Sequence, residues 1–277
     1  MTAIDIERLQ TWIGRTEESR DIVAPGHAAR LAALLDRGAP QPGEALPPLW
    51  HWAYFTPTAP QSQIGPDGHP KRGGFMPPVP LPRRMWAGGR LTFHAPLHVG
   101  EEAHRETEIL SLTEKTGRQG ALVFLTLKHS LSNAAGLVIE EEQDIVYREP
   151  STTSRPAAAA DEPAADWRDP LDPDPVLLFR YSALTFNGHR IHYDLPYATA
   201  EEGYPSLVVQ GPLTATLLME GFVRHTGILP RTYSFRGQAP LFVDGPMRIC
   251  GRKTAEGHDL WAEGPGGYTG MSARVTA

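Results

Sequence analysis

One stretch in the second half of the chain gathers several groups that can transfer or orient protons, in the run YSALTFNGHRIHYDLPYA. An amide and two imidazoles stand at Asn187, His189 and His192, with a guanidinium and a carboxylate at Arg190 and Asp194. Imidazole titrates near neutral pH and can accept or give a proton, whereas an amide can only orient a water molecule. The stretch therefore predicts acid–base chemistry. A structural or surface role is the alternative for the two histidines.

An apolar helix is predicted a few residues further on, at 212–226. Pro212 suits the first helical position, and Gly227 suits the position just past the end. A helix N-terminus presents unpaired N–H groups and the positive end of the helix dipole, which stabilise negative charge. We therefore expect the N–H of Gly211 to bind the oxygen of a reacting carbonyl group. An ordinary helix start uses the same geometry, so the sequence does not separate the two interpretations.

These two segments resemble the hydratase signature of the MaoC-like (R)-specific enoyl-CoA hydratases, which are hotdog-fold enzymes. That signature reads roughly Gly-Asp-x-Asn-Pro-aliphatic-His, followed by a small residue and by a helix that opens with Gly. The matching positions are Ile191, His192 and Ala198. Asn187 stands where the family has Asp, and His189 and Arg190 stand where it has Asn and Pro. The departure at Asn187 matters, because an amide neither accepts nor gives a proton at neutral pH.

The variant Thr-Phe-Asn-x-His-Arg-Ile-His-Tyr-Asp is similar to one subgroup of this superfamily, the double-hotdog hydratases of branched dicarboxylic acyl-CoAs. That subgroup includes the hydratases of mesaconyl-, 3-methylfumaryl- and itaconyl-CoA. Three other segments resemble it as well: PPLWHWAYF near residue 50, GPDGHPKRGGFMPPVPLPRRMWAGGR before residue 90, and EEEQDIVYRE near residue 145. The resemblance implies an α+β double hotdog, in which two antiparallel sheets each wrap a central helix. The dehydratase domain of fatty acid synthases is a further likeness.

The resemblance also implies roles for four residues in adding water to an unsaturated thioester. We expect His192 to carry the proton transfers, Asn187 to hold the water, and the Gly211 N–H to bind the thioester oxygen. His189 either bonds the backbone of its own turn or shares the proton transfer that Asn187 cannot perform. The sequence leaves that choice open, together with the stereochemistry of the addition.

Five residues are predicted to contact the substrate: Arg190, Tyr193, Asp194, Arg83 and Arg84. Arg83 and Arg84 lie in a Pro-rich segment and are expected to meet an acyl carboxylate or the CoA phosphates, because guanidinium binds such anions bidentately. Exposed arginines without such a role are the alternative. Asp194 either orients a histidine or caps the short helix that LPYA begins.

The composition narrows the class of protein. The chain has 277 residues, of which 40% are hydrophobic and 21% charged, and a net charge of −6 argues against a nucleic-acid partner. A single cysteine, Cys250, permits no internal disulfide, and the histidines lack metal-ligand spacing, so no metal site is expected. No Gly-x-Gly-x-x-Gly follows a strand, so CoA is expected only as part of the substrate, with no other cofactor. We expect no membrane contact and a cytoplasmic location.

Two hotdog domains are expected along the chain, one in residues 1–150 and a MaoC-like one in 171–277 that carries the single active site. A linker rich in Pro, Ala and Ser is predicted for 151–170. Residues 1–36 are predicted to be helical, and residues 38–90 to form a Pro/Gly-rich leader to the first sheet. The second hotdog is expected to open with the strand VLLFRYSAL.

Together these features predict a hydro-lyase that reversibly adds water to an enoyl-CoA, with a short branched dicarboxylic acyl-CoA of the itaconyl or mesaconyl type as substrate. Three alternatives remain. They are a (3R)-hydroxyacyl-thioester dehydratase of fatty-acid metabolism, a hotdog thioesterase, and a non-catalytic acyl-thioester binder, which the Asp-to-Asn departure favours. Double hotdogs often pair further, so we expect a homo-oligomer whose size the sequence does not fix.

Overall fold

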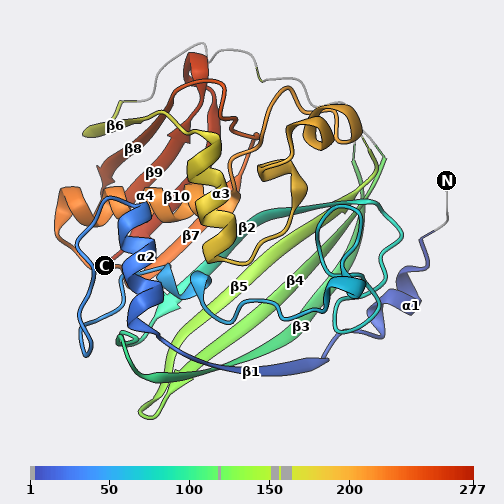
Figure 1. Ribbon diagram of the computed structural model, residues 1–277, viewed down its shortest axis with the longest axis horizontal. Coiled ribbons are helices and arrows are strands. Elements are labelled where there is room, and N and C mark those ends of the chain that lie inside the picture. Colours follow the sequence, from blue (N-terminus) through green and yellow to red (C-terminus); the bar gives the residue numbers. More distant parts are fainter. Residues whose placement is uncertain (1–3, 118–119, 151–155, 157–163) are drawn as a thin grey trace.

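Ten antiparallel strands form one sheet in the computed structural model, which describes residues 4–117, 120–150, 156 and 164–277. The strand order is β1-β3-β4-β5-β2-β7-β10-β9-β8-β6. The first half of the chain supplies β1 (Thr16–Ile22), β2 (Arg83–Phe93), β3 (Glu102–Gly117), β4 (Gly120–Asn133) and β5 (Gly136–Arg148). The second half supplies β6 (Trp167–Leu171), β7 (Thr232–Gly237), β8 (Met247–Thr254), β9 (Gly257–Glu263) and β10 (Thr269–Thr276). Each half of the chain thus builds one side of a continuous sheet (Figure 1).

The two halves meet at β2, which pairs with β5 of the first half and with β7 of the second. Two glycines permit this close pairing. A Cβ on Gly88 would lie 2.5 Å from the carbonyl oxygen of Phe235, and a Cβ on Gly89 would lie 2.8 Å from that of Glu142. Neither position has room for a side chain, so the Gly-Gly pair lets the two halves join here.

Helix α4 (Gly211–Thr226) is the central helix of the second half and confirms the helix predicted from the sequence. It carries Pro212 in its first turn and ends at Gly227, whose φ of 68° lies in the left-handed region that favours glycine. Most residues between Leu213 and Phe222 are buried, because the helix packs against β8, β9 and β10. This packing holds the start of the helix in a fixed place.

The other helices are short. They are α1 (Ile6–Gln10), α2 (Pro25–Leu34), α3 (Pro175–Leu184) and single turns at Trp50–Ala53, Gln61–Gln63, Arg190–His192, Tyr197–Glu201 and Pro265–Gly267. α2 of the first half packs against α3 of the second in front of the sheet (Figure 1). None of the helices within the described residues is long and apolar enough to cross a membrane.

The segment VLLFRYSAL forms helix α3, so the predicted strand is wrong. Its apolar residues are compatible with either structure, but the residues before them favour a helix. The Asp174 carboxylate accepts a hydrogen bond from the Leu177 N–H at 2.7 Å, and Pro175 occupies the first turn.

Two other segments also differ from the prediction. Residues 16–22 were predicted to be helical but form β1, which pairs with β3 at the edge of the sheet; long-range pairing outweighs local helical spacing there. The last four residues of the predicted 151–170 linker belong to β6, which pairs with β8. Residues 151–155 and 157–163 of that linker lie outside the described residues.

Candidate active site

The polar motif forms a tight turn between α3 and a buried extended segment. After α3 ends, the Asn187 N–H bonds the carbonyl of Ser182 at 2.8 Å, and a single helical turn follows at Arg190–His192. The Ile191 carbonyl then accepts the N–H of Val208 at 3.0 Å. This bond draws the end of the motif into the protein, so the ring of His192 is buried.

His192 is held in one tautomer. Its Nδ1 lies 2.7 Å from the Val208 carbonyl oxygen, which can only accept, so Nδ1 carries the proton and donates it. Nε2 is therefore left with a lone pair. Burial, which disfavours the charged ring, lowers the pKa of His192 to about 4. At neutral pH the ring is uncharged and able to act as a base.

Asn187 is oriented by the same turn. Its Oδ1 accepts the backbone N–H of His189 at 3.0 Å, which leaves the side-chain NH₂ group as a donor. The residue lines a cavity of about 250 Å³. An amide fixed in this way can hold a water molecule, and it supplies no proton of its own.

His189 lies between two other histidines. Its ring centroid is 4.2 Å from that of His69 and 5.3 Å from that of His192. His69 in turn bonds the Asp67 carboxylate through Nδ1 at 3.0 Å. Burial, together with the charges that His69 and His192 would carry, lowers the pKa of His189 far below its usual range.

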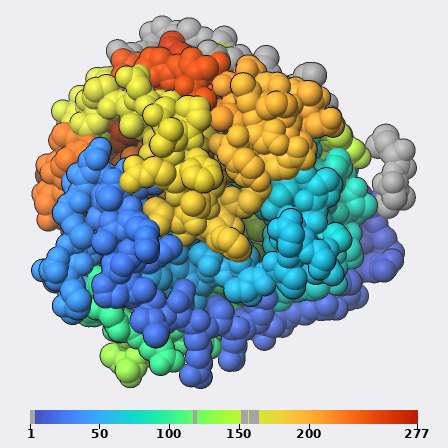
Figure 2. Space-filling view, viewed as in Figure 1, coloured from blue at the N-terminus to red at the C-terminus, as the bar shows by residue number. Residues whose placement is uncertain are grey.

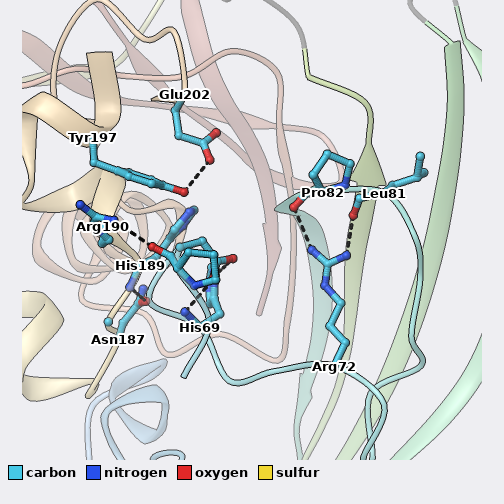
Figure 3. A network of polar contacts seen from close by, with 12 residues as sticks. His69, Arg72, Leu81, Pro82, Asn187, His189, Arg190, Tyr197 and Glu202 are labelled. Atoms are coloured by element: carbon cyan, nitrogen blue, oxygen red, sulfur yellow. Dashed lines mark hydrogen bonds and ion pairs between the residues drawn. The ribbon is translucent and has the colours of Figure 1, made fainter. Parts of the chain in front are cut away.

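The Asp67–His69 pair comes from the first half of the chain, and sequence reasoning missed it. Burial alone would raise the pKa of Asp67, but hydrogen bonds and charge from His69 lower it overall. The Asp67 carbonyl also accepts the Arg190 N–H at 3.0 Å. Figure 3 shows His69 beside His189 and Asn187. In the space-filling view the cyan surface of this loop borders the yellow-orange surface of the motif (Figure 2).

Two glycines allow the loop to lie directly on the motif. A Cβ on Gly68, whose φ is +90°, would lie 1.8 Å from the carbonyl oxygen of Gly188. A Cβ on Gly188 would lie 2.6 Å from the carbonyl oxygen of Gly68. The backbones touch because neither residue has a side chain, and this contact brings His69 onto His189.

The start of α4 borders the same cavity through Pro212, which follows Gly211. A Cβ on Gly211 would lie 3.1 Å from the ring of Trp86, another residue of the cavity wall. Gly211 therefore gives Trp86 room to pack against the helix. The N–H of Gly211 belongs to the first turn, where helix N–H groups have no partner within the helix. Its role as an oxyanion donor stays a prediction.

The cavity lies between the two halves. The second half contributes Tyr181, Thr185, Asn187 and Pro212. The first half contributes His51, Trp52, Tyr54, Phe55, Thr56, Pro57, Trp86, Arg105, His129, Leu131, Glu141 and Gln143. Within the described residues, neither His189 nor His192 is among those that line this wall.

Glu141 is the centre of a buried polar cluster on the first-half wall, which sequence reasoning also missed. Its carboxylate lies 3.1 Å from Nε2 of His51, 2.9 Å from Nε1 of Trp52 and 2.7 Å from the amide of Gln143. Burial alone would raise its pKa, but the hydrogen bond and charge of His51 lower the pKa of Glu141 to about 2. The carboxylate stays ionised because donors surround it.

Strand register completes that cluster. Thr107 on β3 pairs with His129 on β4, and His129 pairs with Glu141 on β5. The three side chains therefore form one row across the inner face of the sheet. Arg105 stands two residues before Thr107 and so points to the same face.

The predicted substrate-binding residues have other partners. Arg190 pairs with Asp194 at 2.8 Å and lies over the ring of Tyr197, and Asp194 also accepts the Tyr197 N–H at 3.1 Å. Tyr193 donates to the Gly188 carbonyl at 2.9 Å. The capping role expected for Asp194 is thereby confirmed. These residues stabilise the motif turn and do not line the cavity.

Arg83 and Arg84, expected in the Pro/Gly-rich leader, are instead the first residues of β2, because they pair with Arg148 and Tyr147 of β5, and they also have other partners. Arg83 forms an ion pair with Glu202 and bonds its carbonyl, and the charge of Arg84 lowers the pKa of Tyr147 against the larger raising effect of burial. Neither lines the cavity, so contact of either with substrate stays a prediction. Within the residues that the structure describes, no group of three or more potential metal ligands occurs.

Comparisons with known proteins fit this geometry. A family model described as hydroxyacyl-thioester dehydratase type 2 matches residues 49–243. The mesaconyl-C(4)-CoA hydratase of Chloroflexus aurantiacus is 53% identical over 268 residues, which cover 95% of this chain and 96% of that protein. A solved MaoC-like dehydratase has a TM-score of 0.74 at 15% identity, covering 97% of this chain and 99% of its own. A Mycobacterium tuberculosis protein with a double hotdog fold has a TM-score of 0.60 at 15% identity, covering 95% of each chain. The predicted double hotdog is confirmed.

Proposed function

The chain belongs to the hydroxyacyl-thioester dehydratase type 2 family, and from this premise we propose that it reversibly hydrates mesaconyl-C(4)-CoA or a closely similar branched dicarboxylic enoyl-CoA. The reaction class is that of a hydro-lyase, as predicted. The identity of 53% with a mesaconyl-C(4)-CoA hydratase over nearly the whole chain is the observation that carries the substrate proposal. Adding water to a double bond leaves the net oxidation state of the substrate unchanged, so the reaction needs no redox cofactor.

His192 is the base in the proposed reaction. Its Nε2 takes a proton from water while the water oxygen bonds to the β-carbon of the enoyl thioester. The π electrons move toward the thioester oxygen, giving an enolate-like species. The imidazolium then returns the proton to the α-carbon, so that one water molecule is added and the ring is neutral again. The fixed tautomer leaves a lone pair on Nε2, and the lowered pKa keeps that nitrogen unprotonated at neutral pH.

Asn187 and Gly211 assist without transferring protons. The NH₂ group of Asn187 is free to orient water in the cavity, since the Oδ1 of the same amide is engaged by His189. The N–H of Gly211 donates to the enolate oxygen at the positive end of α4. His189 bonds Asn187 through its backbone, and its side chain packs between His69 and His192. We propose that its ring positions these partners and leaves proton transfer to His192.

The cavity volume favours a small acyl group. Pockets for drug-sized ligands span about 300–1,000 Å³, and this cavity of about 250 Å³ lies below that range. A five-carbon branched acyl group suits such a space better than a long fatty-acyl chain. Dehydration of a medium-chain (3R)-hydroxyacyl thioester is the second candidate function, favoured by the description of the matched family.

The test is a panel assay on the purified full-length protein. Mesaconyl-C(4)-CoA, crotonyl-CoA and a ten-carbon enoyl-CoA are supplied in turn, and loss of the conjugated thioester and release of free thiol are both followed. We expect hydration of the mesaconyl ester without thiol release. Preference for the ten-carbon ester would favour the dehydratase function, thiol release a thioesterase, and binding without turnover a non-catalytic role.

Two further proposals concern the protein in the cell. We propose a cytoplasmic location and a homo-oligomeric state, because acyl-CoA enzymes of the double-hotdog type are expected to act there and to pair further. Cell fractionation and sedimentation of the purified protein test them separately.

A further inference from the structure

Arg105 is a cation on the cavity wall without an ion-pair partner. No carboxylate lies within 4 Å of its guanidinium among the residues that the structure describes. One nitrogen, Nη2, donates to the Phe55 carbonyl at 3.2 Å, and the guanidinium carbon lies 5.1 Å from the Phe55 ring. Its Nε is buried and has no hydrogen-bond partner. A buried donor on a charged group without an acceptor is costly unless a ligand supplies one.

The carboxylates nearest to Arg105 have other partners or are exposed. Glu141 accepts hydrogen bonds from three side chains, as described above. Asp21 accepts the N–H of Phe55 at 2.8 Å through one oxygen and that of Ile22 at 2.8 Å through the other. Glu17 is exposed on β1. These groups offset the charge of Arg105 at a distance but do not occupy its donors.

His129 also lines this cavity, and one of its buried ring nitrogens has no hydrogen-bond partner. The ring is buried, and Nδ1 lies 2.9 Å from the hydroxyl of Thr107, whereas Nε2 has no hydrogen-bond partner. When the Thr107 hydroxyl donates to Nδ1, the neutral ring carries its proton on Nε2. Burial, with the nearby charge of Arg105 adding to it, lowers the pKa of His129 despite the opposing charge of Glu141, so a neutral ring is expected.

We propose that Arg105 and His129 bind the free carboxylate of the acyl group. This assignment rests on the proposed function and names the residues that recognise its substrate class. A guanidinium offers a planar pair of donors that matches a carboxylate, and the His129 Nε2–H adds a third donor. Glu141 cannot take this part, because its oxygens are acceptors and already engaged.

The chemistry of the substrate requires this site to adjoin the motif. In mesaconyl-C(4)-CoA the free carboxylate and a methyl group are both attached to the β-carbon, where the hydroxyl is added. An anion site must therefore lie within a bond or two of the attacking water. Arg105, His129 and Asn187 line one small cavity, as this requirement demands. The arginines predicted from the sequence, Arg83, Arg84 and Arg190, do not line it.

A matched pair of unreactive thioesters tests the proposal without relying on turnover. 2-Methylsuccinyl-C(4)-CoA is the saturated analogue of the substrate, and isovaleryl-CoA replaces its carboxylate by a methyl group. Calorimetric titration of the full-length protein with each gives a ratio of Kd values. We expect the wild type to bind the dicarboxylic ester about 10²-fold more tightly, the scale of a lost pairing to a buried charge. In Arg105→Met the ratio should fall to near one.

Three variants accompany this test. Arg90→Met is the matched control, because Arg90 points to the opposite face of the sheet and pairs with Glu142 and Asp144; it should keep the wild-type ratio. Arg105→Lys keeps the charge but loses the planar fork, so an intermediate ratio is expected. His129→Gln should lower the ratio by a smaller factor, and melting curves show which variants fold. If Arg105→Met is unfolded, Arg105→Lys serves as the test: an intermediate Kd ratio supports the carboxylate site, and the wild-type ratio overturns it.

Hydration rates on mesaconyl-C(4)-CoA and 3-methylcrotonyl-CoA separate the two proposals. If Arg105→Met prefers mesaconyl-C(4)-CoA over 3-methylcrotonyl-CoA as strongly as the wild type does, the carboxylate site is overturned. The proposed hydratase function would still stand. A wild-type protein that binds both saturated esters equally would also overturn the site. A wild type that binds 2-methylsuccinyl-C(4)-CoA selectively but hydrates no enoyl ester would support the site and reject the proposed function.

Discussion

The polar motif and the inner face of the sheet, which meet at the cavity through Asn187, differ in the kind of group they carry. The motif end holds an amide and imidazoles whose pKa values burial lowers, so His192 and His189 are neutral. The sheet end holds fixed charges, on Glu141 and Arg105, with Glu141 kept ionised by its donors. A base needs an available lone pair, whereas an anion needs a lasting positive charge. Under the two proposals, proton transfer would belong to the motif and substrate recognition to the sheet.

The largest effect is expected at the motif end, from His192→Ala. Loss of the base should lower kcat by about 10²–10⁴-fold, with KM changed much less. Steady-state rates on the preferred ester measure this, and a melting curve checks the fold. A kcat within a few-fold of the wild type would move the base to His189 and break the proposed division between the two walls.

Asn187 tests whether a group that carries no titratable proton also contributes to the rate at the motif end. Asn187→Ala removes the donor that holds the water and should lower kcat by about 10²-fold, as loss of one transition-state hydrogen bond does. Asn187→Asp should remain active, since the hydratase signature that the motif resembles has Asp at this position. Full activity in Asn187→Ala would make the residue structural.

Gly68→Ala should disturb the motif end alone. A Cβ there would collide with the Gly188 backbone and strain a φ of +90°, at a cost of about 1–3 kcal/mol. Urea unfolding measures the loss, and kcat should fall as His69 moves away from His189. Gly14→Ala is the matched control, since its φ is +81° but nothing lies within 4 Å of its Cβ. An equal loss of unfolding free energy in both variants would show that the positive φ alone, rather than the clash with Gly188, causes the destabilisation.

A further effect concerns the dependence of stability on pH. The pKa of His192 is about 4 in the folded protein, against about 6.5 in an unfolded chain. Between these values the unfolded chain binds more protons, so the free energy of unfolding falls as pH decreases from 6.5 toward 4. We expect a loss of up to about 3 kcal/mol from this residue, since a difference of one in pKa corresponds to about 1.4 kcal/mol. Urea titrations of wild type and His192→Gln measure it, and an equal slope in both would contradict it.

The motif end could be predicted from sequence because its groups are close together in the chain. Asn187, His189 and His192 lie in one turn, and the helix start that faces them has its own Pro and Gly signals. Helix α3 could also be predicted from the sequence, since Asp174 and Pro175 form a typical helix start. The apolar run alone is compatible with a strand, whereas the Asp174 cap and Pro175 specify a helix.

The sheet end could not be predicted in the same way. Arg105, His129 and Glu141 come from three strands, and only their register places them side by side. A shift of one residue would turn each side chain to the opposite face of the sheet. The Asp67–His69 loop likewise reaches the motif only through a contact between two distant glycines.

The junction of the two halves, where β2 pairs with β7 at Gly88 and Gly89, determines what happens when the chain is cut into two fragments. Because β2 is hydrogen-bonded to both halves, neither half has a finished sheet edge by itself. A chain cut between residues 150 and 164 should therefore yield fragments that associate with each other in solution. Each fragment alone would lack one wall of the cavity, so hydration should appear only when the two fragments are mixed. The activity of such a split enzyme would report on the pairing of β2 with β7.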